Sequence, residues 1–344
     1  MSNRSTAVSR QYSTTDLSSL VASMDALSVY SPRSSTTLLA SPRQPFRAAG
    51  AFGQSVGTSP NICIICKERP SYRGAVTCGL TCLEKLATGG GDPAMCNFCH
   101  RKPRLRPLHL QCGSRCIANA KKACLYCRAR ARNGRFWHFC GMACKKLAMR
   151  RAPLVMKVPK GHETYEMVER NFVDSWKEGS STPPTVTGVY KVVMNAGLQQ
   201  PYDDYKNRVG NERFLYHGTT RTCKLGKAGS NQTQLCNNGT CGMCNVVKTS
   251  FKVSLAKRSG AFGAGIYTSS ASNKAYSHPS PGGGVVFVTK VVVGKARAVT
   301  AFQEVKSCPR GYDSVVFDRH NGARNETVVY RDDAIRPVFM ITFS

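Results

Sequence analysis

The sequence predicts an α+β fold for its second half, built on a mostly antiparallel sheet and preceded by small cysteine-rich modules and a disordered tail. Three observations predict this organisation. Residues 186–344 alternate strand-like runs with Gly-rich turns, which is typical of antiparallel sheets. Residues 61–150 repeat one cysteine spacing three times, which indicates an array of small modules. Residues 1–60 are rich in Ser, Thr, Ala and Pro and would bury too little apolar surface to offset chain entropy.

The chain is strongly basic, with 49 Lys and Arg, 19 Asp and Glu and a formal net charge of +30. Such an excess favours polyanionic partners, namely RNA, DNA or an acidic protein. The length of 344 residues suggests about two domains. No apolar run approaches the roughly 18–20 residues that cross a bilayer, and the N-terminus lacks the pattern of a secretory signal. We therefore expect an intracellular protein of the nucleus or cytoplasm, with no membrane partner.

The predicted tail contains apolar residues at helical spacing over residues 15–30. Two interpretations of this segment stay open. It is either a frayed part of the tail or a short helix that docks on a partner.

Residues 61–150 hold 12 of the 17 cysteines, in three matched sets. Each set is a Cys-x2-Cys pair followed, after 11 or 12 residues, by a Cys-Gly-x2-Cys pair. The sets are Cys63, Cys66, Cys78 and Cys82, then Cys96, Cys99, Cys112 and Cys116, then Cys124, Cys127, Cys140 and Cys144.

This spacing predicts one structural zinc ion for each set. Structural zinc takes four ligands in a tetrahedron, often from two such pairs. The second pair places its ligands one helical turn apart, and its Gly lets the backbone approach the metal closely. Modules this small hold no core, so metal binding and folding are expected to be one event. Redox or disulfide use of the thiols is the competing interpretation, and ligands traded between neighbouring sets also stay open.

Two basic runs lie between the cysteine pairs of a set: Arg101-Lys-Pro-Arg-Leu-Arg106 and Arg128-Ala-Arg-Ala-Arg-Asn-Gly-Arg135. We expect them to project as loops and to bind RNA or DNA electrostatically, although an acidic protein remains an alternative partner. Phe136, Trp137 and Phe139 follow the second run, where they either stack on bases or form the core of the module.

Residues 151–185 are interpreted as a helical linker, because Tyr165, Val168, Phe172 and Trp176 recur on one face of a helix over 163–176. The domain at 186–344 follows. Its candidate strands are 186–193, 214–217, 265–268, 285–293, 314–317, 327–330 and 338–342.

Three short segments of this domain carry polar or aromatic residues beside a strand or a Gly-rich turn. They read Leu215-Tyr-His-Gly-Thr219, Phe262-Gly-Ala-Gly-Ile-Tyr-Thr268 and Asn325-Glu-Thr-Val-Val-Tyr330. In this order they resemble the His-Tyr-Glu catalytic set of the poly(ADP-ribose) polymerase-like ADP-ribosyltransferases, which split NAD. The resemblance extends over roughly residues 160–344 and implies an ADP-ribosyltransferase-like fold for the α+β domain.

The resemblance assigns a role to four residues. It implies that Gly218 binds the nicotinamide carboxamide through its backbone and that His217 hydrogen-bonds a ribose hydroxyl on the adenosine side. Tyr267 would stack on the nicotinamide ring. Glu326 would stabilise the positive charge that develops as the glycosidic bond breaks. The implied activity is transfer of ADP-ribose, a pentosyl group, from NAD to a protein or nucleic-acid acceptor, as mono- or oligo-ADP-ribose.

Two positions depart from the family pattern. A Ser is usual eight residues after the Tyr, where this chain has Ala275, and a second stacking Tyr is usual where it has His278. Tyr276 is the candidate substitute for that Tyr in binding NAD. The departures keep a second function class open, a catalytically inactive zinc protein that binds NAD, ADP-ribose or nucleic acid.

A fourth cysteine group lies between His217 and Tyr267, and consists of Cys223, Cys236, Cys241 and Cys244. Its Cys-x2-Cys pair predicts another structural zinc site with no open position. A flexible lid rich in Asn and Gly is the alternative for this segment. Cys308 stands alone and is expected to be an inert thiol.

Overall fold

The computed structural model describes residues 61–105, 109–134, 138–177, 179, 181–230, 232, 234–278 and 284–344. The predicted tail at residues 1–60, including its candidate helix, lies outside the described residues, as do Phe136 and Trp137. No helix in the described ranges is long and apolar enough to span a bilayer.

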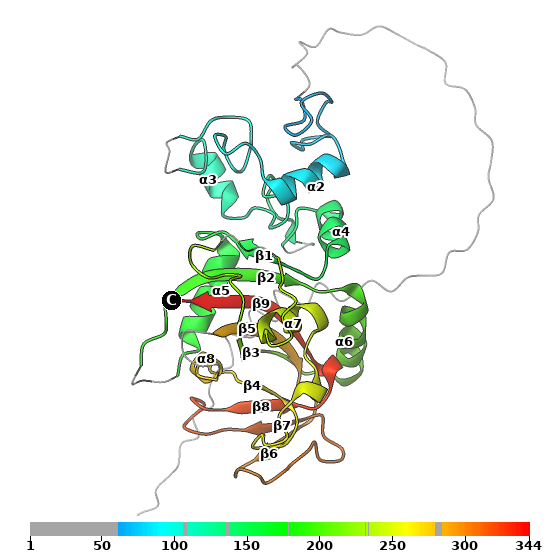
Figure 1. Cartoon of the computed structure of the whole chain (residues 1–344), viewed down its shortest axis with the longest axis vertical. Helices are drawn as coiled ribbons and strands as arrows, with labels where there is room; N and C mark the ends of the chain where they lie inside the picture. Colours follow the sequence, from blue (N-terminus) through cyan, green and yellow to red (C-terminus); the bar gives the residue numbers. More distant parts are fainter. Residues whose placement is uncertain are drawn as a thin grey trace, which may run out of the picture.

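Two sheets build the second half of the chain, in the strand orders β1-β2-β9-β5-β3 and β4-β8-β7-β6. All strand pairs are antiparallel except β6 with β7, which confirms the predicted α+β class. Figure 1 shows the strands following one another down the molecule in this order. The strands are β1 (Leu154–Val158), β2 (Val186–Val193), β3 (Glu212–Thr220), β4 (Ile266–Thr268), β5 (Gly284–Val292), β6 (Ala296–Val299), β7 (Ser314–Phe317), β8 (Glu326–Val329) and β9 (Ile335–Phe343).

Four helices accompany these sheets in the described part: α5 (Glu163–Asp174), α6 (Ala196–Val209), α7 (Gly242–Thr249) and α8 (Ser272–Tyr276). The predicted helix over 163–176 is α5. Its apolar face, with Tyr165, Val168 and Phe172, is buried in one cluster with residues of β2 and β9. The spacing of these residues by three and four positions puts them on one side of the helix.

The helical linker predicted for residues 151–185 is corrected by this packing. The helix forms, but β1 precedes it and pairs with β2 along its whole length, from Leu154 opposite Val193 to Val158 opposite Val189. The segment is therefore part of the α+β domain, which begins before residue 186.

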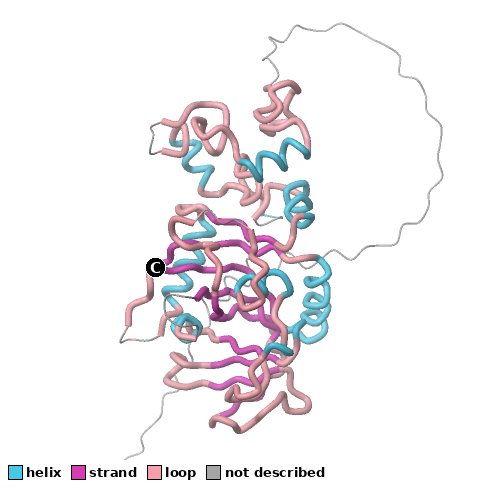
Figure 2. The backbone as a smooth tube through the Cα atoms, viewed as in Figure 1, coloured by secondary structure: helices cyan, strands magenta, loops and turns pink. Residues whose placement is uncertain are grey.

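The three cysteine modules share one local structure, in which mostly irregular backbone carries one short helix each (Figure 2). In every module an isolated β-bridge flanks the first cysteine pair, and the residue after that pair (Lys67, His100 or Arg128) has a positive φ of 58°, 53° or 54°. The helix then starts directly after the Cys-Gly dipeptide. The helices are α2 (Leu80–Gly89), α3 (Ser114–Ala120) and α4 (Met142–Arg150).

The third module packs against the α+β domain. Leu125 and Leu147 of the module share an apolar cluster with Met156 of β1 and Phe339 of β9, so the two regions have a common core. Phe139 is buried in the same cluster, which places it in a core and not on a base-stacking surface.

Polar contacts reinforce this interface. The α5 cap, His162, accepts a hydrogen bond from Thr164 N–H at Nδ1 (3.0 Å), so its Nε2–H donates to Ala123 O (2.8 Å). Arg132 pairs with Glu163 at 2.6 Å, and Arg128 donates to Lys157 O at 3.1 Å. The basic run at 128–135 was expected to project as a loop, and these contacts correct that for Arg128 and Arg132.

Candidate active site

The two sheets meet at a single β-bridge. Tyr216 N–H on β3 donates to Ser269 O at 2.7 Å, and Ser269 N–H donates to Tyr216 O at 2.9 Å. The residue after Tyr216 is His217, and Tyr267 lies two residues before Ser269. The junction therefore brings the first two of the three predicted catalytic segments together.

His217 is held in one tautomer. Its Nδ1 lies 2.8 Å from Tyr267 O, and because a carbonyl only accepts, Nδ1 carries the proton. Burial is the main cause that lowers the pKa of His217 to about 4, and the charge of His278 also lowers it. The hydrogen bond to the Tyr267 carbonyl acts in the opposite direction and raises the pKa. The ring is therefore neutral near pH 7, and Nε2 is a hydrogen-bond acceptor suited to a hydroxyl group. The Phe251 ring packs edge-on against it, with centroids 4.8 Å apart.

Gly218 lies on the open edge of the larger sheet, since β3 is its last strand. Tyr216 directs its backbone N–H and C=O away from β5 and toward Ser269. A strand directs the backbone groups of alternate residues to the same side, so Gly218 presents a donor and an acceptor on that edge. In the described part of the chain, the N–H and C=O of Gly218 form no backbone hydrogen bond outside the named strands. A planar amide could bind there through both groups.

Tyr267 is anchored by its hydroxyl group, which accepts from Phe262 N–H at 2.8 Å and donates to Gly263 O at 2.9 Å. The Gly-rich turn before it needs glycine: Gly263 has φ +81°, and an added Cβ would lie 1.8 Å from Lys306 O. The sequence therefore folds this turn tightly and fixes the tyrosine ring from its far end.

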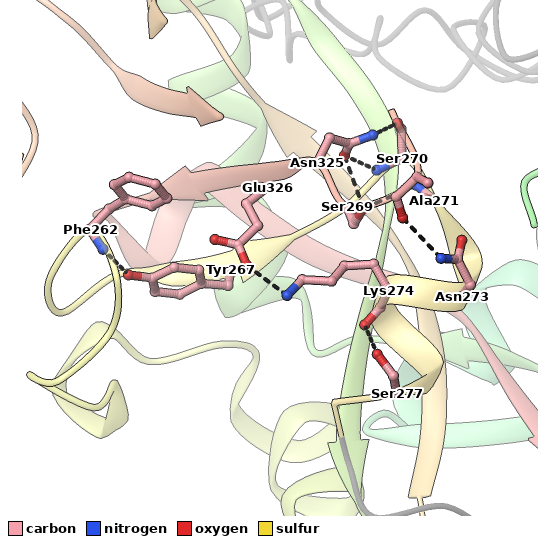
Figure 3. A network of polar contacts seen from close by, with 11 residues as sticks. Phe262, Tyr267, Ser269, Ser270, Ala271, Asn273, Lys274, Ser277, Asn325 and Glu326 are labelled. Atoms are coloured by element: carbon pink, nitrogen blue, oxygen red, sulfur yellow. Dashed lines mark hydrogen bonds and ion pairs between the residues drawn. The ribbon is translucent and has the colours of Figure 1, made fainter. Parts of the chain in front are cut away.

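Glu326 is the first residue of β8. Tyr267 pairs with Val328, and Glu326 lies two positions before Val328, so its side chain is on the same face of the sheet as Tyr267. Its Oε1 forms an ion pair with Lys274 Nζ at 2.8 Å (Figure 3). Its Oε2 is buried without a hydrogen-bond partner in the described part of the chain. A buried carboxylate oxygen left in this state is a candidate ligand-binding atom.

The residue before Glu326 fixes the start of β8. Asn325 Oδ1 accepts from Ser269 Oγ (2.9 Å) and Ser270 N–H (3.0 Å), while its Nδ2 donates to Ser270 Oγ (2.6 Å) and Gly322 O (2.8 Å). Figure 3 shows this network beside Tyr267 and Glu326. The amide thus ties β8 to the segment that joins β4 to α8.

The structure brings His217, Gly218, Tyr267 and Glu326 to one junction. Tyr276 contacts other residues: its ring packs against Trp176 (5.6 Å) and Phe343 (5.2 Å). The charge of His278 lowers the pKa of the His217 ring. Ala275 is buried in an apolar cluster.

Sequence reasoning missed three residues of this site, Lys274, Asn325 and Phe251. A single lysine or phenylalanine outside a recognisable motif carries no pattern. Asn325 gave a weak signal, because an Asn directly before a strand often bonds local backbone.

All four predicted cysteine groups come together, each within its own set, with Sγ atoms within 4.8 Å of one another. Ligands are therefore not traded between modules. Neighbouring Sγ atoms lie 3.6 to 3.9 Å apart, far from the roughly 2.0 Å of a disulfide. Zn–S bonds of about 2.3 Å in a tetrahedron place the sulfur atoms about 3.8 Å apart. The donor sets thus fit zinc.

One thiol in each of three groups is prepared for metal binding. Burial alone would raise the pKa of Cys63, but backbone amides of Cys66 and Ile65 donate to the sulfur and bring it to about 6. Cys96 and Cys241 have the same balance and the same value of about 6. A thiolate is the form that binds zinc.

The site as a whole offers an amide-binding edge, an aromatic ring, a neutral imidazole acceptor and a buried carboxylate. A carboxylate beside a breaking glycosidic bond stabilises an oxocarbenium-like transition state. The arrangement is therefore equipped to bind a nucleotide with an amide-bearing ring and to assist loss of that ring.

A sequence model described as the poly(ADP-ribose) polymerase catalytic domain matches residues 162–343, which is more than half of the chain. The match begins at the α5 cap and ends at the last residue of β9, so it spans β2 to β9 and the whole candidate site. No curated protein matches the chain. The chain therefore belongs to the family of poly(ADP-ribose) polymerase catalytic domains, ADP-ribosyltransferases that use NAD as their substrate.

Proposed function

We propose that this protein transfers ADP-ribose from NAD to a protein or nucleic-acid acceptor, as mono- or oligo-ADP-ribose, and releases nicotinamide. The observation that carries the proposal is the unpartnered Oε2 of Glu326, buried on the same sheet face as Tyr267. Burying a polar atom without a partner is unfavourable by about 1–3 kcal/mol. A ribose hydroxyl of NAD would satisfy this oxygen.

The family match and the geometry of the junction support the following roles. The Gly218 backbone binds the carboxamide, Tyr267 covers the nicotinamide ring, and His217 Nε2 accepts a hydrogen bond from a ribose hydroxyl. Glu326 stabilises positive charge on the nicotinamide ribose. Nicotinamide leaves with the electron pair of the glycosidic bond and becomes neutral. The acceptor then forms a bond to C1 of the ribose and loses its proton.

The test is incubation with NAD labelled in its adenylate part, together with a mixture of protein and nucleic acid. We expect nicotinamide release and label on one macromolecule class, and both strongly reduced with Glu326→Gln. Label on the protein fraction or on the nucleic acid would identify the acceptor.

A second candidate function is binding of NAD or ADP-ribose without cleavage. It is favoured by Ala275, which is buried among apolar side chains where the family has a hydroxyl donor. NAD binding with no nicotinamide released, whatever acceptor is supplied, would establish this candidate and exclude the first.

The four cysteine groups are proposed to hold four structural zinc ions. The first two cysteine modules are proposed to bind nucleic acid. Arg101 joins these two modules through Ile62 O (3.4 Å) and Ser71 Oγ (3.2 Å). Lys67, Arg69 and Lys102 are exposed around this contact. Affinity of the full chain for single-stranded RNA should fall steeply with salt, and a variant with all three changed to Gln should bind more weakly. Salt-independent binding would favour a protein partner.

A further inference from the structure

The fourth cysteine cluster (Cys223, Cys236, Cys241 and Cys244) lies next to the catalytic strand in both sequence and space. Cys223 follows the end of β3 by three residues, and Cys241 and Cys244 are at the start of α7. The thiols of Cys223 and Cys244 are 3.8 Å apart. The cluster therefore joins the end of the strand that carries His217 to the first turn of α7.

The start of α7 rests directly on that strand. A Cβ added to Gly242 would lie 2.3 Å from Thr219 Oγ1 and 3.4 Å from Thr220 O, so a side chain has no room there. Asn238, in the loop between the cysteines, donates to Thr222 Oγ1 at 3.3 Å. The loop and the helix thus both contact residues that follow the His217-Gly218 dipeptide.

The other end of α7 reaches the His217 ring. Ser250 caps the end of the helix with a positive φ of 60°, and its hydroxyl donates to Ile335 O at 3.3 Å. The next residue, Phe251, is buried and meets the His217 ring edge-on at 4.8 Å, with an angle of 76° between the rings. Phe251 also packs against Phe287 of β5, with centroids 6.3 Å apart.

α7 consequently connects the cluster at one end with the catalytic imidazole at the other. Met243 and Val247 pack the helix onto β5 and β9, so apolar contacts also hold α7 on the sheet. Apolar packing is weakly directional, whereas four bonds to one ion fix the end of a helix in position. We infer that metal bound by the fourth cysteine cluster positions the His217 ring through α7 and Phe251, so that NAD affinity depends on this metal. This inference rests on the proposed binding of NAD at His217.

The experiment compares three full-length variants. Cys236→Ser removes one ligand from the fourth cluster, Cys78→Ser removes one from the first module as the matched control, and Phe251→Leu keeps all the ligands but removes the ring. Zinc content, ADP-ribose affinity by calorimetry and the imidazole nitrogen NMR signals of His217, assigned with His217→Gln, are measured for each. ADP-ribose serves as the probe because it binds without turnover.

We expect Cys236→Ser to lose one zinc ion, shift the His217 signals and weaken ADP-ribose binding about tenfold. Phe251→Leu should keep its zinc, shift the His217 signals and weaken ADP-ribose binding to a similar extent. The double variant, Cys236→Ser with Phe251→Leu, should bind ADP-ribose about as well as either single variant, because both changes act through one coupled path. Cys78→Ser should lose one zinc ion and change neither His217 nor affinity. Unchanged His217 signals in Cys236→Ser would overturn the inference. Absence of ADP-ribose binding in wild type, with the signals shifted as expected, would count against the proposed function and leave the metal-to-His217 coupling standing.

Discussion

Lys274 Nζ lies 2.8 Å from one carboxylate oxygen of Glu326, while the other oxygen is buried without a protein partner in the described structure. The ion pair orients the carboxylate from one side and leaves the remaining oxygen free to accept a hydrogen bond from a ligand. Because the lysine is on α8 and the glutamate on β8, their positions depend on the Asn325 bonds that tie β8 to the segment leading into α8.

Glu326→Gln should reduce kcat for NAD consumption roughly 100- to 1000-fold. The amide has nearly the same shape but cannot stabilise positive charge in the transition state, so ADP-ribose affinity should change little. Initial rates of nicotinamide release check this, with the exposed Glu304 changed to Gln as the control. Equal rates in Glu326→Gln and wild type would refute the assigned role.

Tyr267→Ala and Tyr267→Phe should have different effects. The first removes the aromatic face and should raise the Kd for NAD. The second keeps that face but leaves Phe262 N–H and Gly263 O without their partner, which should lower stability by about 1–3 kcal/mol. Calorimetric binding and thermal unfolding of both variants separate the two effects, and a Tyr267→Ala protein with wild-type affinity would argue against stacking.

Metal analysis of the folded protein should give about four zinc ions per chain, because each group of four thiols can bind one ion. Cys66→Ser should remove one ion, and Cys308→Ser, outside the groups, should remove none. Mass spectrometry of metal content checks both. Values near zero in a folded, active protein would rule the zinc assignment out.

The shared core of the third module and the α+β domain predicts that they unfold together. Leu147 is 2% exposed, and Leu147→Ala should destabilise the protein by about 2–5 kcal/mol in one transition. Leu105 is 58% exposed, so Leu105→Ala should change little. Calorimetry checks this prediction. If the third module and the α+β domain unfolded separately, two transitions would appear, and Leu147→Ala would shift the Tm of only the smaller one.

Lys191 gives a pH dependence to stability. Burial, with the nearby charges of Arg336 and Lys290, lowers its pKa to about 7 in the folded protein, below the roughly 10.4 of an exposed lysine. Between these two pKa values Lys191 is protonated in the unfolded chain but neutral in the folded protein. The buried charge therefore lowers the free energy of unfolding by its full amount below pH about 7, and this loss diminishes as pH rises. Lys191→Met should therefore raise Tm more at pH about 6 than at pH about 9. An equal gain at both values would contradict the shift.

Much of the cysteine architecture could be predicted from the sequence, because four ligands at fixed spacing leave few arrangements. The strands β2 and β7 follow their β-branched patterns closely. β1 was missed because Leu154–Val158 (Leu-Val-Met-Lys-Val) does not alternate apolar and polar residues in the way that marks a strand without its partner β2. α6 was missed because it contains Pro201, and a proline argues against a helix interior.

The candidate site residues that stand in recognisable motifs could be predicted from the sequence. Those that join the site only through tertiary contacts could not. His217, Tyr267 and Glu326 stand in recognisable segments. Whether Tyr276 or His278 neighbours His217 depends on where α8 ends, and sequence rules are weakest at helix ends. The helix ends at Tyr276, whose ring packs on Phe343, and the charge of the later residue, His278, acts on the imidazole.

The short strand β1 has a practical consequence for expression. A fragment cut at the family boundary, residue 162, would lack this strand and leave the β2 backbone as an uncovered sheet edge. Such an edge is a template for pairing with other chains and for aggregation. It would also leave the apolar side chains that contact Leu125 and Leu147 exposed to solvent. The smallest soluble piece that retains the candidate site should therefore start ahead of Cys124, with the third cysteine module retained.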